Sequence, residues 1–227
     1  MIPIFVTGTD TGVGKTWVAS LLIRGLRQAG HRVGAYKPAC SGAETAADGT
    51  LHWDDIDALA AAVDDPHLSI DAICPQRFAA PLAPPLAAAR EGKDVNRSQL
   101  TTGIDWWRSR VDVLVIEGAG GIHCPMTHQT TLADILAVWR FPTVVVAANR
   151  LGTINHTLLT IEAVRSREIP LLGFIMNDVG PHLDRSARDE NITEIVRRGR
   201  VACLAHVDWE QREMDVGWTQ DVLGGKT

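Results

Sequence analysis

The residues best suited to chemistry lie near the start of the chain, at positions 8–16, with the sequence GTDTGVGKT. An apolar stretch precedes this run and a helical pattern follows it, which is where a phosphate-binding loop lies between a strand and a helix. Glycines such as Gly12 and Gly14 let backbone N–H groups approach phosphate oxygens. Lys15 supplies a compact positive charge, and the Thr16 hydroxyl can bind Mg²⁺. These residue types predict a site for a nucleotide and its magnesium ion.

The spacing of the glycines departs from the usual pattern. Gly8 lies six residues before Gly14, one more than Gly-x-x-x-x-Gly-Lys-Thr allows, and Thr9 stands where a glycine is expected. A glycine-rich structural turn is therefore the alternative interpretation. The order of strand, Gly-Lys-Thr and helix favours the phosphate loop.

A second group of candidate residues is the run 111–121, VDVLVIEGAGG, which reads as an apolar strand that ends in Glu117 and then glycines. A carboxylate at the carboxyl end of a buried strand can bind Mg²⁺ directly or through water. The alternative is a solvated acid at a strand end. Beside a Gly-Lys-Thr loop the metal role is favoured.

Strand and helix patterns alternate along the chain and must position these residues. Helical patterns are expected at 17–29, 132–139, 154–168 and 186–198. Short β-branched runs predict strands at 2–7, 32–36, 111–116, 143–147, 171–176 and 201–204. Such alternation predicts an α/β, P-loop NTPase-like fold, with a mainly parallel sheet, helices on both faces and ligands beyond the carboxyl ends of the strands.

Two segments lack this periodicity. Residues 38–53 are rich in Gly, Ala, Thr and Asp and read as a mobile loop near the site. Residues 75–85 read as irregular, because Pro81, Pro84 and Pro85 exclude a continuous helix or a central strand. No repeat or linker interrupts the chain, so one domain over residues 1–227 is expected.

Composition limits the classes of partner. The 22 basic and 27 acidic residues leave a formal charge of -5, which argues against nucleic acid or an anionic membrane as a partner. No stretch approaches membrane-spanning length, and the N-terminus does not resemble a cleaved signal sequence. The four cysteines form no Cys-x-x-Cys pair, which fits a reduced cytosol and predicts a cytoplasmic protein.

Five separated motifs resemble those of the dethiobiotin synthase family. No single motif is decisive, but all five occur in order, and in this family a lengthened phosphate loop is the norm. The motifs are FVTGTDT with GKT at 5–16, YKP with SG at 36–42, EGAGG at 117–121, LGTINH at 151–156 and NDV at 177–179.

The resemblance implies the following reaction. One amine of 7,8-diaminopelargonate is carbamylated by CO₂, the carbamate is phosphorylated by ATP, and the second amine closes the ring. The products are dethiobiotin, ADP and phosphate. Mg²⁺ is implied as the cofactor, and a homodimer is implied, with the helix that begins at residues 151–156 at its interface and helping to receive the substrate carboxylate.

The resemblance also implies roles for individual residues. Lys15 would hold the phosphates and Lys37 would contact both carbamate and γ-phosphate, although a lysine at a strand end is more often a solvated surface charge. Thr11 and Ser41 would bind substrate, and Asn177 would read the adenine edge unless it only caps a turn. The nucleotide site would comprise Gly12, Val13, Gly14, Lys15, Thr16, Trp17, Asp55, Glu117, Gly118, Ala119, Gly120, Asn177 and Asp178.

The third metal-associated carboxylate has several candidates. Asp54, Asp55 and Asp57 all fall where the family has an aspartate that opens a helix. Asp55 best reproduces the helical spacing, whereas Asp54 matches if no residue is inserted after Ser41. The predicted metal ligands are therefore Thr16 and Glu117 with Asp55 or Asp54, and the other acids would cap the helix.

Two segments depart from the family pattern. Pro84 and Pro85 stand where the family commonly has Ser-Pro-His, so no site residue is assigned there. Residues 204–208 only weakly resemble the glycine-containing, proline-ended segment near the adenine, although their backbone remains a candidate lining.

Other functions with this fold are the alternatives. A nucleotide-switch ATPase of the partition or septum-site type would need a signature lysine where this chain has Asp10. A synthetase-like domain acting on another amine or carboxylate, as in cobyrinate-type amidotransferases, would carry a glutaminase domain, for which this chain is too short. A binding module without catalysis is the third alternative.

Overall fold

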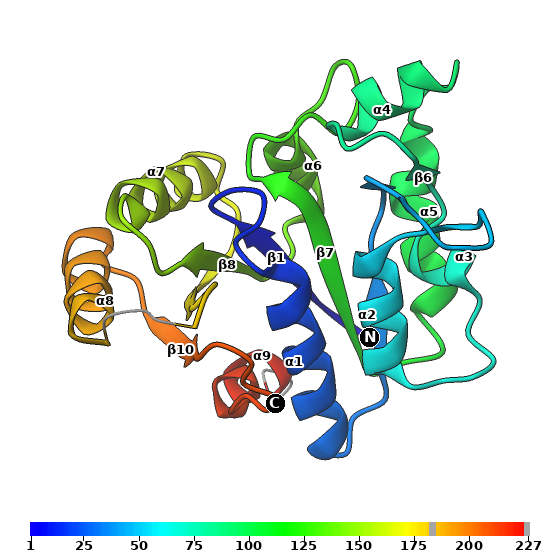
Figure 1. Ribbon diagram of the computed structural model, residues 1–227. Helices are drawn as coiled ribbons and strands as arrows, with labels where there is room; N and C mark the ends of the chain where they lie inside the picture. The colour runs from blue at the N-terminus through cyan, green and yellow to red at the C-terminus, as the bar shows by residue number, and fades with distance from the viewer. Residues whose placement is uncertain (182–184, 225–227) are drawn as a thin grey trace.

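A single parallel sheet forms the centre of the structure. The structure, a computed structural model, describes residues 1–181 and 185–224 (Figure 1). Six strands lie in the order β10-β9-β8-β1-β7-β2, and every pairing between them is parallel. The strands are β1 (Ile2–Gly8), β2 (Val33–Tyr36), β7 (Val113–Gly121), β8 (Thr143–Ala148), β9 (Leu171–Asn177) and β10 (Cys203–Val207).

Side chains of the strands alternate between the two faces of this sheet. In β1, Ile4 and Val6 pack on one face and Phe5 packs on the other. This period of two follows from strand geometry and requires both faces to be covered. Each fully buried side chain of this size contributes roughly 1.5–3 kcal/mol to stability.

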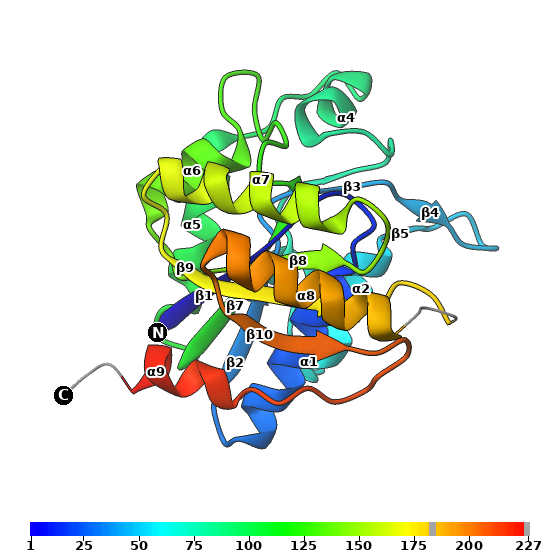
Figure 2. The same ribbon diagram turned by 90° about the vertical axis from the view of Figure 1, so that its left-hand side faces the viewer.

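Helices cover the two faces. On the face of Ile4 lie α1 (Lys15–Gln28), α2 (Asp54–Val63) and the C-terminal segment with the 3₁₀ turn η1 (Gly217–Thr219) and α9 (Gln220–Leu223). Buried residues of five helices belong to the apolar cluster on the face of Phe5. Its helices are α4 (Pro84–Arg90), α5 (Arg97–Trp107), α6 (Leu132–Trp139), α7 (Thr153–Ser166) and α8 (Arg185–Gly199), of which α7 and α8 lie side by side (Figure 2).

The predicted elements are present with shifted ends. The helix expected at 17–29 begins at Lys15, since the lysine and threonine of the phosphate loop already form its first turn. The strand expected at 111–116 continues to Gly121, because Gly8 of β1 pairs with Gly121 after an irregularity in the register. Glu117 therefore lies inside a strand and not at its end. The last strand comprises Cys203–Val207 and not residues 201–204.

The two segments without periodicity carry short elements. Residues 38–53 contain β3 (Cys40–Ser41) and a hairpin of β4 (Glu44–Thr45) and β5 (Leu51–His52). A short strand, β6 (Arg77–Phe78), pairs with β3 outside the main sheet, and the four-residue helix α3 (Ile70–Ile73) precedes it. The expected irregular segment is wrong at its end, because Pro84 and Pro85 open α4, where a missing N–H costs no helical hydrogen bond.

Among the helices described, none combines the length and apolar character needed to cross a membrane.

Candidate active site

The phosphate loop lies at the carboxyl edge of the sheet. It leads from β1 into α1, and its neighbour β7 carries Glu117, while Lys37 directly follows β2. Because carboxyl ends of parallel strands meet at one edge, residues from distant parts of the chain converge there.

Gly14 holds a position in the loop that only glycine fits well. Gly14 caps α1 with φ of 84°, and a Cβ on it would lie 2.1 Å from Asn177 Nδ2. Lys15 is buried, and its Nζ donates a hydrogen bond to the Asp10 carbonyl at 3.0 Å. Burial lowers the pKa of Lys15, although the nearby Glu117 opposes this effect. The ammonium thus has few anionic partners before a phosphate arrives.

Lys37 is the centre of a buried charge cluster. Its Nζ lies 2.6 Å from Glu117 Oε1 and 2.8 Å from Asp55 Oδ2. Burial lowers the pKa of Lys37, but the field of Glu117 and then of Asp55 outweighs it, so that the pKa is raised and the side chain is an ammonium ion. Lys37 is only 2% exposed, which excludes the interpretation as a solvated surface charge.

Oxygen atoms suited to magnesium surround this cluster. The Thr16 hydroxyl lies 2.6 Å from Asp55 Oδ1 and 2.9 Å from Glu117 Oε1, and its single proton serves one of them at a time. Within the described residues, Glu117 Oε2 is buried without a hydrogen-bond partner. An unpaired buried oxygen is costly. Thr16, Asp55 and Glu117 therefore fit Mg²⁺, which prefers hard oxygen ligands.

The first turn of α2 separates the three candidate aspartates. Asp55 points toward Thr16 and Lys37, whereas the Asp54 side chain is 72% exposed and lies 3.4 Å from His52 Nδ1. Asp57 also faces His52, at 3.5 Å. Because successive helical residues point about 100° apart, only one of two neighbours can face the site. This geometry favours Asp55 as the metal-associated carboxylate, because Asp54 faces His52 and solvent.

A pocket of about 590 Å³ opens beside these charges. Thr11 and Ser41, the expected substrate contacts, both line it, as do Ala119 and Gly120. Residues 81–84, to which the sequence assigned no role, form another part of its wall. The pairing of β6 with β3 brings this segment next to Ser41, and no local sequence pattern announces that pairing.

A second pocket, of about 560 Å³, extends from the same loop toward the residues that follow β9 and β10. Asn177 lies in its wall, donates Nδ2 to the Val13 carbonyl at 2.9 Å, and within the described chain leaves its buried Oδ1 without a partner. Residues that line this pocket are Gly12, Gly14, Trp17, Asn177, Asp178, Val179, Trp209, Glu210 and Arg212.

Trp209, Glu210 and Arg212 were missed from the sequence. The last strand ends at Val207, three residues later than expected. The loop after this strand, which carries the three residues, therefore begins later in the sequence than the predicted strand implies. The weak resemblance at residues 204–208 was the available signal.

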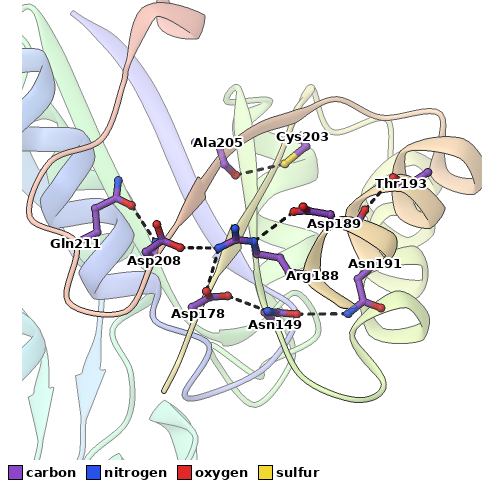
Figure 3. Close-up of polar contacts among 10 residues, drawn as sticks. All are labelled: Asn149, Asp178, Arg188, Asp189, Asn191, Thr193, Cys203, Ala205, Asp208 and Gln211. Carbon is purple, nitrogen blue, oxygen red and sulfur yellow. Dashed lines mark hydrogen bonds and ion pairs between the residues drawn. The ribbon is translucent and has the colours of Figure 1, made fainter. Parts of the chain in front are cut away.

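Three expected nucleotide contacts are placed differently. Gly118 faces the core, where a Cβ would lie 2.6 Å from a Leu132 methyl group. The Val13 side chain is fully buried, and its backbone carbonyl accepts a hydrogen bond from Asn177 Nδ2. The Asp178 carboxylate is held by Asn149 and Arg188, although the residue lines the second pocket (Figure 3).

Solved structures with the same architecture include a cell division ATPase and a ParA family ATPase. The chain is similar to the cell division ATPase MinD from Pyrococcus furiosus, with a TM-score of 0.52, 16% identity, and coverage of 91% of this chain and 83% of that one. A ParA family ATPase from Chlorobium tepidum matches with a TM-score of 0.54 at 14% identity, covering 92% of this chain and 84% of that one. These likenesses confirm the predicted P-loop NTPase-like fold.

Closer similarity is found among curated sequences. A family model described as an AAA domain matches residues 3–215. The ATP-dependent dethiobiotin synthetase of Anaeromyxobacter dehalogenans strain 2CP-1 is 41% identical, with 98% of this chain and 97% of that protein covered. The synthetase of Rhodopirellula baltica is also 41% identical, covering 81% of this chain and 75% of that protein, and that of Xanthomonas oryzae is 36% identical, covering 90% of each. The chain therefore belongs to the ATP-dependent dethiobiotin synthetase family.

Proposed function

We propose that the first pocket closes the urea ring of dethiobiotin on 7,8-diaminopelargonate, with CO₂ and ATP consumed and ADP and phosphate released. The chain has the activity of its family, an ATP-dependent ligase reaction of biotin biosynthesis. The observation that carries the proposal for this pocket is the meeting of Lys37, Glu117 and Thr16 beside a phosphate loop.

Phosphoryl transfer in this pocket rests on positioning and charge. Lys15 binds the phosphates, while the Lys37 ammonium lies where it can screen a carbamate oxygen from the γ-phosphate that it attacks. Thr11 and Ser41 supply hydroxyl groups to the same pocket, where they bind the carbamylated amine. Thr16, Asp55 and Glu117 would hold Mg²⁺, which would supply charge neutralisation for the phosphates.

The second pocket takes the nucleoside part of ATP. It shares Gly12 and Gly14 with the first pocket, so a nucleotide can extend from one to the other along the phosphate loop. Asn177 lines this pocket, and its buried Oδ1, which has no partner among the described residues, is an acceptor suited to an amino group on the base.

A coupled assay tests this function. Purified protein with ATP, Mg²⁺, bicarbonate and diaminopelargonate should release phosphate and form a product with the mass of dethiobiotin. The control omits the diamine. Phosphate release at the same rate without diamine would count against the proposal.

The protein acts as a homodimer through α7 in this proposal. Leu159 in the middle of that helix is 56% exposed, and Leu151, two residues before its first residue, is 104% exposed. Exposed leucines on and beside one helix suit a contact between subunits. Light scattering at micromolar concentration should give twice the chain mass, and Leu159→Glu should reduce it. A monomer at every concentration would refute the dimer.

The remaining expectations concern the whole chain. Residues 1–227 act as one ATP-binding domain in the cytoplasm, a placement supported by the four free cysteines.

A further inference from the structure

A buried arginine on α8 lies between two aspartates, each of which follows a different strand. The Arg188 side chain is 7% exposed, and its Nη1 donates to Asp178 Oδ2 at 3.1 Å and to Asp208 Oδ1 at 2.6 Å (Figure 3). Its Nε also lies 3.6 Å from Asp189 Oδ1. Neither Arg188 nor its bridge was anticipated from any sequence motif, and the phosphoryl transfer described above does not use it.

The two bridged aspartates begin the loops that form the walls of the second pocket. Asp178 directly follows β9 and lies between Asn177 and Val179, which both line the pocket. Asp208 directly follows β10 and precedes Trp209, which lines the pocket with Glu210 and Arg212. Arg188 therefore links the two walls of the pocket through its ion pairs with Asp178 and Asp208.

Further hydrogen bonds extend this bridge to a third strand. Asn149, which follows β8, donates Nδ2 to Asp178 Oδ1 at 2.9 Å and accepts a hydrogen bond from Asn191 of α8 at 3.3 Å. The Asp208 N–H donates to Gln211 Oε1 at 2.9 Å, which folds the second wall back on itself (Figure 3). Arg188 and Asn191 of α8 thus share one polar network with the residues that follow β8, β9 and β10.

The Arg188 guanidinium joins the two carboxylates through one nitrogen, Nη1, whose direction is set by the guanidinium plane. A planar guanidinium reaches two carboxylates in fixed directions, whereas a lysine offers a point charge on a flexible stem. Removal of the guanidinium would leave Asp178, 8% exposed, without its cation in a poorly solvated place. The loops would then move so that the carboxylate reaches water, and the pocket walls would lose their preset spacing.

We infer that Arg188 is a positioning residue for the nucleotide, which presets the walls of the base pocket and thereby sets the affinity for ATP. The inference rests on the proposed use of the second pocket for the nucleoside. Preorganised walls raise affinity because the ordering of the loops is complete before binding. The charge cluster of Lys37 lies in the other pocket, so the chemical step does not depend on Arg188.

Two variants test the bridge with the fold retained. Arg188→Lys keeps a cation near Asp178 but places it on a shorter, flexible stem without the planar geometry that directs Nη1 at both carboxylates, and Asp208→Asn weakens one arm only. Each should raise the Kd for ADP, measured by calorimetry, and the KM for ATP by about tenfold. The kcat at saturating ATP and the KM for the diamine should stay within about twofold of the wild-type values.

The matched control is Arg197→Ala on the same helix. Arg197 forms an exposed ion pair with Glu194 at 2.8 Å, away from both pockets. This variant should leave the Kd for ADP unchanged. A thermal melt of each protein separates affinity from stability, because a purely structural role would lower Tm with no change in Kd.

Distinct outcomes separate this inference from the proposed reaction. An unchanged Kd and KM in both variants would overturn the positioning role, as would a loss of kcat with an unchanged KM. If the wild-type protein bound ADP but made no dethiobiotin, and the variants still bound ADP more weakly, the reaction would fail while the positioning role stood.

Discussion

At the scale of single residues, the site depends on charges that balance one another in a buried place. Lys37 forms ion pairs with the buried Glu117 and the half-exposed Asp55, which lowers the cost of placing the Lys37 and Glu117 charges in a poorly solvated position. A substrate carbamate and a nucleotide with its metal ion would redistribute these partners. The roles proposed for Lys37, Glu117 and Asp55 therefore rest on their mutual contacts.

Lys37→Ala should lower kcat by at least about a hundredfold with a smaller change in the KM for ATP, because its charge matters most in the transition state. Lys15→Ala should impair both parameters, since that ammonium binds the phosphates in every state. Steady-state kinetics with ATP and diamine varied in turn measure the difference. Equal and mild effects of the two substitutions would contradict these roles.

The neighbours Asp55 and Asp54 form a matched pair for the metal site. Asp55→Asn should reduce activity by about tenfold or more and raise the Mg²⁺ concentration required for half-maximal rate, because it removes a charged oxygen ligand. Asp54→Asn, on the exposed side of the same turn, should behave as the wild type. A Mg²⁺ titration of both variants checks this. A larger defect in Asp54→Asn would reverse the assignment.

At the scale of elements, the turn from β1 into α1 couples two distant motifs. Gly14 holds a left-handed conformation and lies against Asn177 at the end of β9, so the phosphate loop and the base pocket share one contact. Because Gly14 has no side chain, the turn from β1 into α1 can lie directly against the end of β9.

Gly14→Ala should weaken ADP binding strongly, because its Cβ would displace Asn177 and its backbone would cost roughly 1–2 kcal/mol of strain. Gly30→Ala is the control, with φ of 92° and nothing within 4 Å of the added Cβ. It should carry a similar strain and leave ADP affinity unchanged. Calorimetry and thermal melts of both variants compare the two effects, and equal ADP affinities would falsify the proposed contact.

At the scale of the whole molecule, a sheet buried on both faces gives the site a rigid support. β1 lies in the middle of the sheet, with β8 and β7 beside it and helices on each face. The phosphate loop therefore leaves an interior strand of the sheet, and the segment after β10 returns to cover α1, where Val216 packs near Gly25.

Ile4→Ala should lower the free energy of unfolding by about 2–5 kcal/mol, because the truncated side chain is fully buried and leaves a cavity. Val138→Ala, at a position that is 77% exposed on α6, should change it by less than about 0.5 kcal/mol. Urea unfolding at equilibrium measures both. A small effect of the Ile4 substitution would show that β1 is not central to stability.

The sequence alone determined the features that depend on neighbouring residues. The phosphate loop, the alternation of strands and helices and the family resemblance are contiguous patterns, and the fold and activity that they predict are confirmed. Glu117 and Lys37 could be named as candidates because each lies in or next to a strand on the same edge of a parallel sheet. Their distances to one another could not be read from the pattern.

The directions of side chains and the contacts between distant segments follow from the tertiary structure and not from local sequence patterns. Asp55 rather than Asp54 faces the site because the phase of α2 follows from how that helix packs on α1, which local spacing does not specify. Residues 81–84 and Trp209 became pocket walls through pairing and strand ends far away in the sequence. Arg188 acquired its place because the buried carboxylate of Asp178 and the half-exposed carboxylate of Asp208, each following a separate strand, meet beside one cation, and that meeting exists only after the chain has folded.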